Sequence, residues 1–541
     1  MTDVHDRRGG DALVGLGPMV RLLMRRDRVK LPAWTGGLAG FALYVTVAIP
    51  AAYGSDDDLA SISGIFTDPV GRLLVGPGHG LDEPTVARFV TNGYGLYLMI
   101  VAAVMNILLV VRHTRGEEQT GRAELVRANV VGRHTSLAAT VVVALLTNVV
   151  AGIGVWAVLV VVGGHGVAGS LVFGSSIAAL GLAFAGVTAT TAQLTSSARA
   201  AAGIAGGVLG AAFVLRAGGD MARQGGSALS WTSALGWAQQ TAPFVHDRWW
   251  PLLPLIVLAA ATTVAGFWLS RHRDVGASLF AVRPGPPRAR PALGTPLGLA
   301  LRLQRAAIVG WGAALAVSGI VFGAFADPLL DAIDDMPDVF RDVFGTDDLL
   351  AGYLAYMATF MAFLTAAYCV LAVQGYRDEE AGGRGEPLLA TPVSRRAWLG
   401  ANVAATALGA FAILLVTGIT TGVGAAVATG DRRHVAELTG AHLNAVPSVL
   451  VTLGVAVLLY GVRSRAVPLA WAIVGYGVVV GTFGSLVGLP DIAFGVSPFE
   501  HHAAVPLDAF APLPIAILTT ATVVSATAGV LAFERRDLDT T

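Results

Sequence analysis

Long apolar runs recur along the whole chain, separated by shorter polar or charged stretches. Each run can cross the hydrocarbon core of a bilayer as an α-helix, which takes about 20 residues. The runs cover residues 33–53, 90–111, 137–162, 169–192, 200–217, 250–270, 306–324, 350–374, 398–428, 441–462, 467–488 and 512–533. The pattern predicts an all-α, polytopic integral membrane protein with about 12 transmembrane helices.

The charge of the chain agrees with this fold class. Only 13% of the 541 residues are charged and 54% are hydrophobic, whereas soluble domains carry about 25% charged residues. If both termini lie on one side of the membrane, 28 of the 36 lysine and arginine residues fall on that side. Cytoplasmic loops carry such an excess, so the sequence predicts a multi-pass protein of the cell membrane with both termini inside (N-in/C-in).

One charged stretch occurs twice. The segment "RGEEQTGRAELVRANVVGRHTSLAA" at 115–139 aligns without gaps with "RDEEAGGRGEPLLATPVSRRAWLGA" at 377–401, and 11 of 25 positions are identical. Chance gives about two identities. The identical pairs are Arg115/Arg377, Glu117/Glu379, Glu118/Glu380, Gly121/Gly383, Arg122/Arg384, Glu124/Glu386, Ala128/Ala390, Val131/Val393, Arg133/Arg395, Leu137/Leu399 and Ala139/Ala401. The sixth and twelfth runs also both end in Arg-Asp, at Arg273-Asp274 and Arg536-Asp537.

The duplication predicts two parallel six-helix repeats, a fused pseudo-dimer whose halves share one orientation. The stretches before the first and seventh runs also pair, through Arg25/Arg302, Arg28/Arg305 and Trp34/Trp311. The predicted organisation is a cytoplasmic N-terminal interfacial helix within 1–30, a first transmembrane half at 31–272, a cytoplasmic Pro/Arg-rich linker at 273–298, a second half at 299–535 and a cytoplasmic tail at 536–541.

The repeated loops have two interpretations. They are either solvated connectors that follow the positive-inside rule, or handles that dock onto a partner. The glutamates favour the second interpretation, because acidic residues contribute nothing to the positive-inside rule and yet keep their spacing. Two equivalent docking loops imply a partner with two equivalent binding sites, which a homodimer provides.

The glutamate pair, the following "GRxE" and the "LLATPVSRR" that leads into a helix resemble the permease subunits of ABC exporters with the ABC type-2 transporter fold. The similarity is strongest to the large twelve-span actinobacterial class associated with antibiotic efflux, which includes the tetronasin-resistance and polyketide-antibiotic permeases. The resemblance implies that 115–136 and 377–396 are coupling regions and that 15–30 and 294–305 are interfacial helices. The first loop departs from the pattern, with "LVRANVVGRH" where the second has "LLATPVSRR".

Carried onto this chain, the resemblance assigns two groups of residues. Coupling to the ATPase falls to Glu117, Glu118, Gly121, Arg122, Glu124, Arg133, Glu379, Glu380, Gly383, Arg384, Glu386 and Arg395. The interfacial helices carry Arg25, Arg28, Arg302 and Arg305.

The chain has no ATP site of its own. A P-loop needs a lysine within G-x-x-x-x-G-K-[ST], and the only lysine, Lys30, lies in "DRVKLPAW". The resemblance implies that two copies of a separate ABC ATPase bind the ATP and Mg²⁺, and that this chain is a transport subunit rather than an enzyme. An ion-coupled secondary transporter of the major facilitator architecture is the alternative, although the predicted spans lack ionisable residues away from their ends. A membrane-embedded enzyme ranks third, because no catalytic constellation stands out.

The substrate is expected to be a hydrophobic or amphipathic compound such as an antibiotic or drug, and a lipid or glycoconjugate fits the helices equally well. Export, rather than import, rests on the resemblance. Candidate lining residues of a central cavity are Tyr94, Tyr97, Asn106, Phe213, Tyr353, Tyr356, Phe360 and Tyr476. Neither a metal site nor a nucleic-acid partner is expected. Glu500, His501, His502 and His434 are predicted near the outer surface, but their spacing is short and no further ligand cluster accompanies them. The acidic segment 326–345 is predicted to be an outer lid or cap.

Overall fold

The computed structural model describes residues 11–53, 56–274, 287–326, 349–483, 489–505, 507 and 511–538. The chain divides into two compact units, called here unit 1 (Met1–Pro284) and unit 2 (Gly285–Thr541). This boundary falls within the predicted linker 273–298, of which residues 275–286 lie outside the described part. The acidic segment 326–345 lies outside it from residue 327 onward.

Twelve helices among the described residues are long and apolar enough to cross a membrane, which confirms the predicted all-α polytopic fold. They are Lys30–Ala51, Gly95–Gln119, Thr135–Val162, Val167–Leu194, Ala198–Ala222, Leu252–Ser270, Pro296–Ala324, Leu350–Ala381, Arg395–Thr429, Arg433–Val462, Ser464–Thr482 and Pro512–Arg535. The second continues to Gln119 and the eighth to Ala381, so both carry the start of the repeated charged stretch at their ends. No β-strand occurs in the described ranges.

Unit 1 is built around α10 (Val167–Leu194), which contacts α6 (Gly95–Val111), α9 (Thr135–Ala157) and α13 (Leu252–Ser270). Close approach is possible where glycines face each other, because a Cβ on Gly152 of α9 would lie 2.7 Å from the carbonyl oxygen of Gly174 in α10. The other labelled helices are α1 (Leu16–Arg26), α2 (Lys30–Ala52), α3 (Asp56–Thr67), α4 (Pro69–Val75), α5 (Val86–Arg88), α7 (Glu117–Gln119), α8 (Arg122–Arg127), α11 (Ala198–Ala222) and α12 (Ala234–Gln239).

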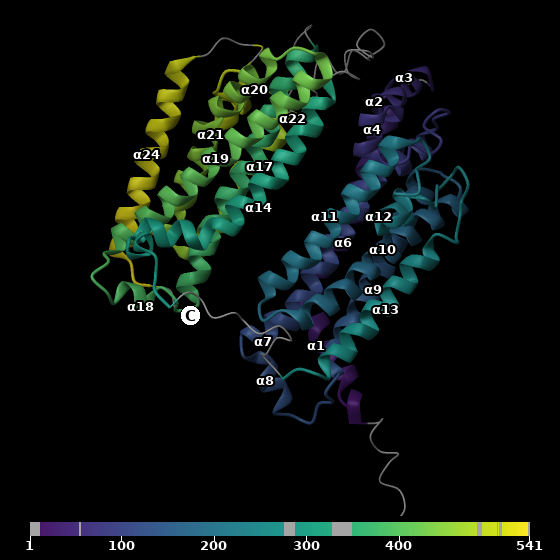
Figure 1. The fold of residues 1–541 in the computed structure, drawn as a ribbon, viewed down its shortest axis with the longest axis horizontal. Coiled ribbons are helices and arrows are strands. Elements are labelled where there is room, and N and C mark those ends of the chain that lie inside the picture. Colours follow the sequence, from purple (N-terminus) through teal and green to yellow (C-terminus); the bar gives the residue numbers. More distant parts are fainter. Residues whose placement is uncertain are drawn as a thin grey trace, which may run out of the picture. The chain divides into compact units, whose positions relative to one another are not determined.

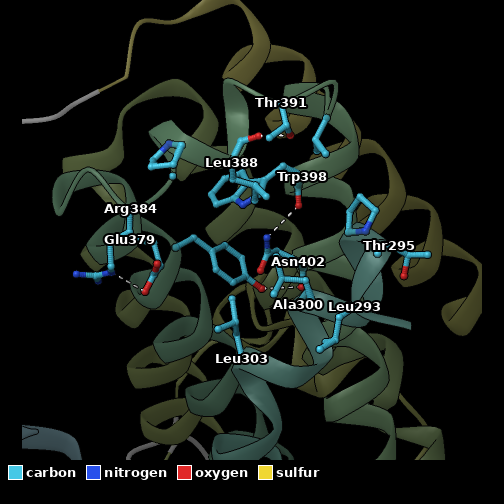
Figure 2. Close-up of a pocket in the computed structure, with 17 residues that line it drawn as sticks. Leu293, Thr295, Ala300, Leu303, Glu379, Arg384, Leu388, Thr391, Trp398 and Asn402 are labelled. Atoms are coloured by element: carbon cyan, nitrogen blue, oxygen red, sulfur yellow. Dashed lines mark hydrogen bonds and ion pairs between the residues drawn. The ribbon is translucent and has the colours of Figure 1, made fainter. Parts of the chain in front are cut away.

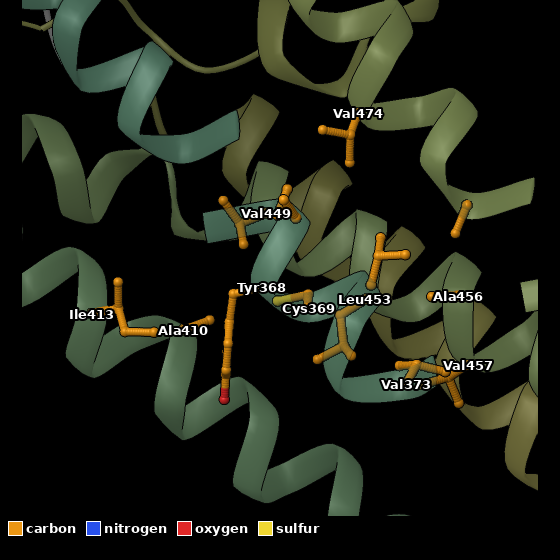
Figure 3. Close-up of a cluster of buried hydrophobic side chains, with 14 of the residues drawn as sticks. Tyr368, Cys369, Val373, Ala410, Ile413, Val449, Leu453, Ala456, Val457 and Val474 are labelled. Carbon is orange, nitrogen blue, oxygen red and sulfur yellow. The ribbon is translucent and has the colours of Figure 1, made fainter. Parts of the chain in front are cut away.

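Unit 2 is built around α17 (Leu349–Ala381), which contacts α19 (Arg395–Thr429), α20 (Arg433–Asn444) and α21 (Val446–Val462). Its core packs Tyr368 and Cys369 with Leu453, Val457 and their neighbours (Figure 3). The remaining helices are α14 (Pro296–Ala324), α18 (Glu386–Leu389), α22 (Trp471–Phe483), α23 (Asp491–Val496) and α24 (Pro512–Arg535). Helix α14 packs against α19, and α24 packs against α21.

The two units differ at their first helices. In unit 1, α1 is a separate amphipathic helix that contacts α9, with Leu23 fully buried, and the chain turns at Asp27 before α2 begins. In unit 2, α14 runs without a break from Pro296 to Ala324. The expected interfacial helix at 294–305 is therefore wrong as a separate element, since residues 296–305 form the first turns of a transmembrane helix.

The physical reason lies in the residues at the break. Asp27 is buried, forms an ion pair at 2.5 Å with Arg112 and shares a 2.5 Å hydrogen bond with His113, and these contacts fix the turn between α1 and α2. The repeat aligns Asp27 with Gln304, because Arg25/Arg302 and Arg28/Arg305 share one offset. Gln304 lies inside the helix, donates to the carbonyl oxygen of Asn402 and accepts from Thr406.

Candidate coupling site

The two repeated charged stretches each follow the same path at one end of their unit. In unit 1 the stretch continues α6 through α7 and α8, which lie at the same end of the unit as α1 (Figure 1). In unit 2 it continues α17 into α18. We call these two regions coupling region 1 (residues 115–136) and coupling region 2 (residues 377–396).

The repeated glycine has a backbone cause. Gly121 and Gly383 have φ angles of +71° and +66°, in the left-handed region that favours glycine. Each amide also donates to the carbonyl oxygen three residues earlier, at 3.2 Å from Gly121 to Glu118 and 2.9 Å from Gly383 to Glu380. Both glycines therefore end one helical stretch and reverse the chain into the next short helix.

The second glutamate of each pair holds the end of the last helix of its unit. Arg273, which follows α13, donates to both carboxylate oxygens of Glu118 at 2.5 and 2.9 Å. Arg536, which follows α24, donates to both oxygens of Glu380 at 2.6 and 2.7 Å. Bidentate pairs of this kind are the strongest side-chain hydrogen bonds in proteins. We call the two pairs the Glu–Arg clamps.

The repeated arginine strengthens the same junction. Arg133 donates to the carbonyl oxygen of Arg271 at 2.8 Å, and Arg395 donates to that of Arg536 at 2.6 Å. Basic side chains commonly satisfy the last carbonyls of a helix in this way. Conserved spacing of Glu118, Glu380 and these arginines thus has a cause within each unit, and contact with a partner is not required to explain it.

The first glutamate of each pair differs between the units. Glu117 accepts from Arg26 of α1 at 2.7 Å, and this hydrogen bond raises the pKa of the Arg26 guanidinium. Glu379 instead pairs with Arg384 of its own loop at 3.1 Å, which raises the pKa of Arg384 in the same manner. The coupling regions therefore share their clamp but not their contact with the preceding helix.

The remaining charged residues predicted for coupling are exposed on the surface of their unit. Arg122 and Glu124 in region 1, and Arg384 and Glu386 in region 2, are exposed. Leu125 beside them is 72% exposed. The arginines predicted for the interfacial helices, Arg25, Arg28, Arg302 and Arg305, are exposed as well.

The predicted cavity residues fall into separate groups within the units. Asn106 is fully buried and exchanges two amide hydrogen bonds with Asn148, at 2.9 and 2.8 Å, so it packs helix against helix. Tyr353 is also buried and donates to the carbonyl oxygen of Phe322. Three of the others make ring contacts: Tyr94 with Phe89 and Tyr97, Phe360 with Phe322, and Phe213 with the guanidinium of Arg216. The remaining two donate hydrogen bonds, Tyr356 to the Thr482 hydroxyl and Tyr476 to the carbonyl oxygen of Ala493.

The histidines near the outer surface do not form a metal centre in the described ranges, where no group of three or more His, Cys, Asp or Glu side chains could hold an ion. His502 lies 3.2 Å from the Ser448 hydroxyl, and burial lowers the pKa of His502 to about 4. His434 lies 3.3 Å from Glu437.

Several residues of the site were not assigned from the sequence. Arg273 and Arg536 are visible there as repeated Arg-Asp endings, but nothing links them to glutamates 155 and 156 positions earlier. Asp27 carries a faint signal, as a lone acid among the bases of "RRDRVK".

Twelve apolar helices in two units, each with a clamped charged region at one end, define a multi-pass α-helical protein of the cell membrane. The chain belongs to a family of multidrug efflux permeases: the family model described as "Multidrug efflux system permease Rv1217c, C-terminal domain" matches residues 16–271 and 293–534. The multidrug efflux system permease protein Rv1217c of Mycobacterium tuberculosis (strain ATCC 25618 / H37Rv) is 34% identical over 535 residues, which are 98% of this chain and 96% of that protein. Membership of this family indicates a transport subunit rather than an enzyme.

Proposed function

We propose that this chain is the transmembrane permease subunit of an ATP-driven ABC exporter that moves hydrophobic or amphipathic compounds, such as antibiotics, out of the cell. Membership of a multidrug efflux permease family supports efflux of such compounds. The ABC type-2 architecture and the tetronasin-resistance class are the finer parts of this proposal, and they rest on the sequence resemblance of the two coupling regions.

One observation carries the coupling part of the proposal. Each unit carries a charged region that a Glu–Arg clamp ties to the end of its last helix, and that region presents Glu124 or Glu386 on its outer face. The clamp itself has a cause within each unit. An exposed acidic position at the same place in both units suits a partner with two equivalent docking sites.

The motor is a pair of ABC ATPase subunits. These partners bind the ATP and Mg²⁺, since the lysine that a P-loop requires occurs in this chain only as Lys30, outside any such motif. One ATPase copy docks on each coupling region. The exposed arginines of α1 and α14 contact the membrane surface or the same partner.

The clamps give the mechanism a route for force. When the ATPase pair closes, a push on α8 reaches the end of α13 through Glu118 and Arg273. A push on α18 reaches the end of α24 through Glu380 and Arg536. Rocking of one half against the other then exposes a central cavity alternately to the two sides of the membrane.

A secondary carrier remains the second candidate because of one buried ion pair. Arg216 and Asp220, near the C-terminal end of α11, are both fully buried and lie 3.5 Å apart. Ionisable residues within membrane helices often serve ion pathways. Here, however, Arg216 donates to the carbonyl oxygens of Arg72 and Leu73 in α4, and Asp220 accepts from Ser230, so the cluster ties α11 to α4 and to the segment that follows α11.

The test is co-purification with an ABC ATPase from the same genome, using a tag on this chain. The double variant Glu124→Ala/Glu386→Ala changes only exposed positions and is expected to lose the ATPase while keeping its elution volume. Glu83→Ala, at an exposed acidic position outside both coupling regions, is the control and should retain two ATPase copies. If the parent chain captures no ATPase, or the double variant binds it as the parent does, the coupling role fails and the secondary carrier becomes the better explanation.

A further inference from the structure

Each unit contains a pocket at its coupling region, and the two pockets are built by equivalent residues. In unit 1 the pocket is about 60 Å³ and lies between α1 and α8, and in unit 2 it is about 440 Å³ and lies between the start of α14 and α18. The repeat aligns eight lining residues pairwise: Met19/Pro296, Leu22/Leu299, Arg26/Leu303, Thr114/Tyr376, Glu117/Glu379, Ala123/Gly385, Val126/Leu388 and Ser136/Trp398.

The difference in volume follows from one of these pairs. In unit 1 the Arg26 side chain lines the pocket and pairs with Glu117 at 2.7 Å, so a guanidinium occupies the space beside that carboxylate. In unit 2 the aligned residue is Leu303, which cannot make that bond. The neighbouring positions are Leu299, Leu388 and Trp398, so the larger pocket has an apolar wall.

Glu379 of unit 2 has one neighbouring arginine, whereas the equivalent Glu117 of unit 1 has two. Glu117 takes the Arg26 hydrogen bond together with a favourable electrostatic contribution from Arg122. Glu379 keeps Arg384, the equivalent of Arg122, and lacks an equivalent of Arg26. The Glu379–Arg384 pair is at the surface, with side chains 39% and 59% exposed, and such pairs hold their partners weakly.

Figure 2 shows how these features are arranged around the pocket. Glu379 and Arg384 lie together at one side, and Leu293 and Thr295 lie at the other. Trp398 and Leu388 lie between them. The volume falls in the range of pockets that hold drug-sized ligands, about 300–1,000 Å³.

We propose that the pocket of unit 2 binds lipophilic organic cations, with the apolar body against Leu299, Leu303, Leu388 and Trp398 and the cationic group on Glu379, where unit 1 has the guanidinium of Arg26. The cationic group of the ligand takes the place that the Arg26 guanidinium has in unit 1, since the aligned residue of unit 2 is Leu303. The site goes beyond the transport function proposed above, because binding requires only unit 2 and no ATPase. A ligand there contacts both α14 and coupling region 2.

The experiment uses the full chain, purified without an ATPase in nanodiscs of phosphatidylcholine. Binding of tetraphenylphosphonium, a lipophilic cation, is measured by equilibrium dialysis beside triphenylphosphine oxide, a neutral compound of related shape. Glu379→Gln is expected to weaken the affinity for the cation about tenfold, the usual size of one charge-assisted contact. The affinity for the neutral compound should change less than twofold.

Two further variants make the result specific to this pocket. Leu303→Arg places in unit 2 the arginine that unit 1 carries, and it should abolish binding of both compounds. Glu117→Gln, at the equivalent position of unit 1, should leave both affinities within twofold of the parent. Elution volume and thermal unfolding confirm that each variant is folded.

The proposal is overturned if the parent shows no saturable cation binding, or if Glu379→Gln binds the cation as the parent does. Equal weakening of both compounds by Glu379→Gln would also contradict it, because the carboxylate would then act without regard to charge. Failure of the chain to bind an ATPase leaves this result unaffected, so the two proposals fail separately.

Discussion

The clamp of unit 2 gives the most quantitative prediction. Arg536 forms its bidentate pair with Glu380, and its guanidinium lies 5.1 and 5.0 Å from the ring centroids of Tyr460 and Phe533. The Glu380 side chain is only 3% exposed and that of Arg536 is 14% exposed. Glu380→Gln keeps the shape of the side chain and removes its charge, which leaves a mostly buried guanidinium without its counter-ion. Removal of one partner from a buried ion pair costs about 3–5 kcal/mol, and the partial exposure of Arg536 places the expected loss at the lower end, about 3 kcal/mol.

The assay is a double-mutant cycle on the free energy of unfolding, measured by denaturant titration of the purified chain. Glu380→Gln and Arg536→Met are made singly and together. Once the charge of Arg536 is gone, loss of the Glu380 charge should cost little, so the double variant should be no less stable than Glu380→Gln alone. The reasoning is refuted if Glu380→Gln costs less than about 1 kcal/mol, the range of a surface pair, or if the two single losses simply add.

Three other outcomes follow from the same physical arguments. Gly383→Ala should destabilise the chain by about 1–2 kcal/mol, because its φ of +66° strains any residue with a Cβ, although no atom within 4 Å would obstruct one; an unchanged unfolding midpoint would contradict this. Asn106→Leu should cost about 1–3 kcal/mol by leaving the buried Asn148 amide unpaired, while Asn106→Leu/Asn148→Leu recovers part of the loss; altered drug affinity at unchanged stability would instead place Asn106 in the cavity. Burial lowers the pKa of His79 to about 4, so as pH falls this residue takes up a proton near pH 6.5 in the unfolded chain and only near about pH 4 in the folded chain. The free energy of unfolding should therefore decrease as pH falls between these two values. His79→Gln should reduce this dependence of the free energy of unfolding on pH.

The fold could be predicted largely from the sequence because the bilayer imposes a simple rule. Every backbone group must be satisfied within the membrane, so an apolar run of sufficient length is a helix. The duplication was equally visible, since its glycines and glutamates keep their spacing. The boundaries were less predictable, because a helix such as Gly95–Gln119 continues into charged residues once it leaves the hydrocarbon core.

The candidate site shows where sequence reasoning stops. The alignment identified Glu118 and Glu380 as repeated residues, but it could not show that they bind Arg273 and Arg536 within their own units. That information depends on packing between helices far apart in the sequence. A separate helix was predicted before the first span of each half, and the continuity of α14 was beyond prediction. The aligned stretches "RRDRVK" and "RLQRAA" share two arginines, and only the structure shows that Asp27 binds Arg112 and His113 at a turn.

The energy source of transport is the central claim, and inside-out proteoliposomes test it most directly. The chain is reconstituted with its ATPase partner, and uptake of a fluorescent hydrophobic antibiotic is followed with ATP and Mg²⁺ or with an imposed proton or sodium gradient. Uptake is expected only with ATP, Mg²⁺ and the ATPase; a protonophore should leave it unchanged, and Glu124→Ala/Glu386→Ala should abolish it. Uptake driven by an ion gradient in vesicles that hold this chain alone would contradict this claim.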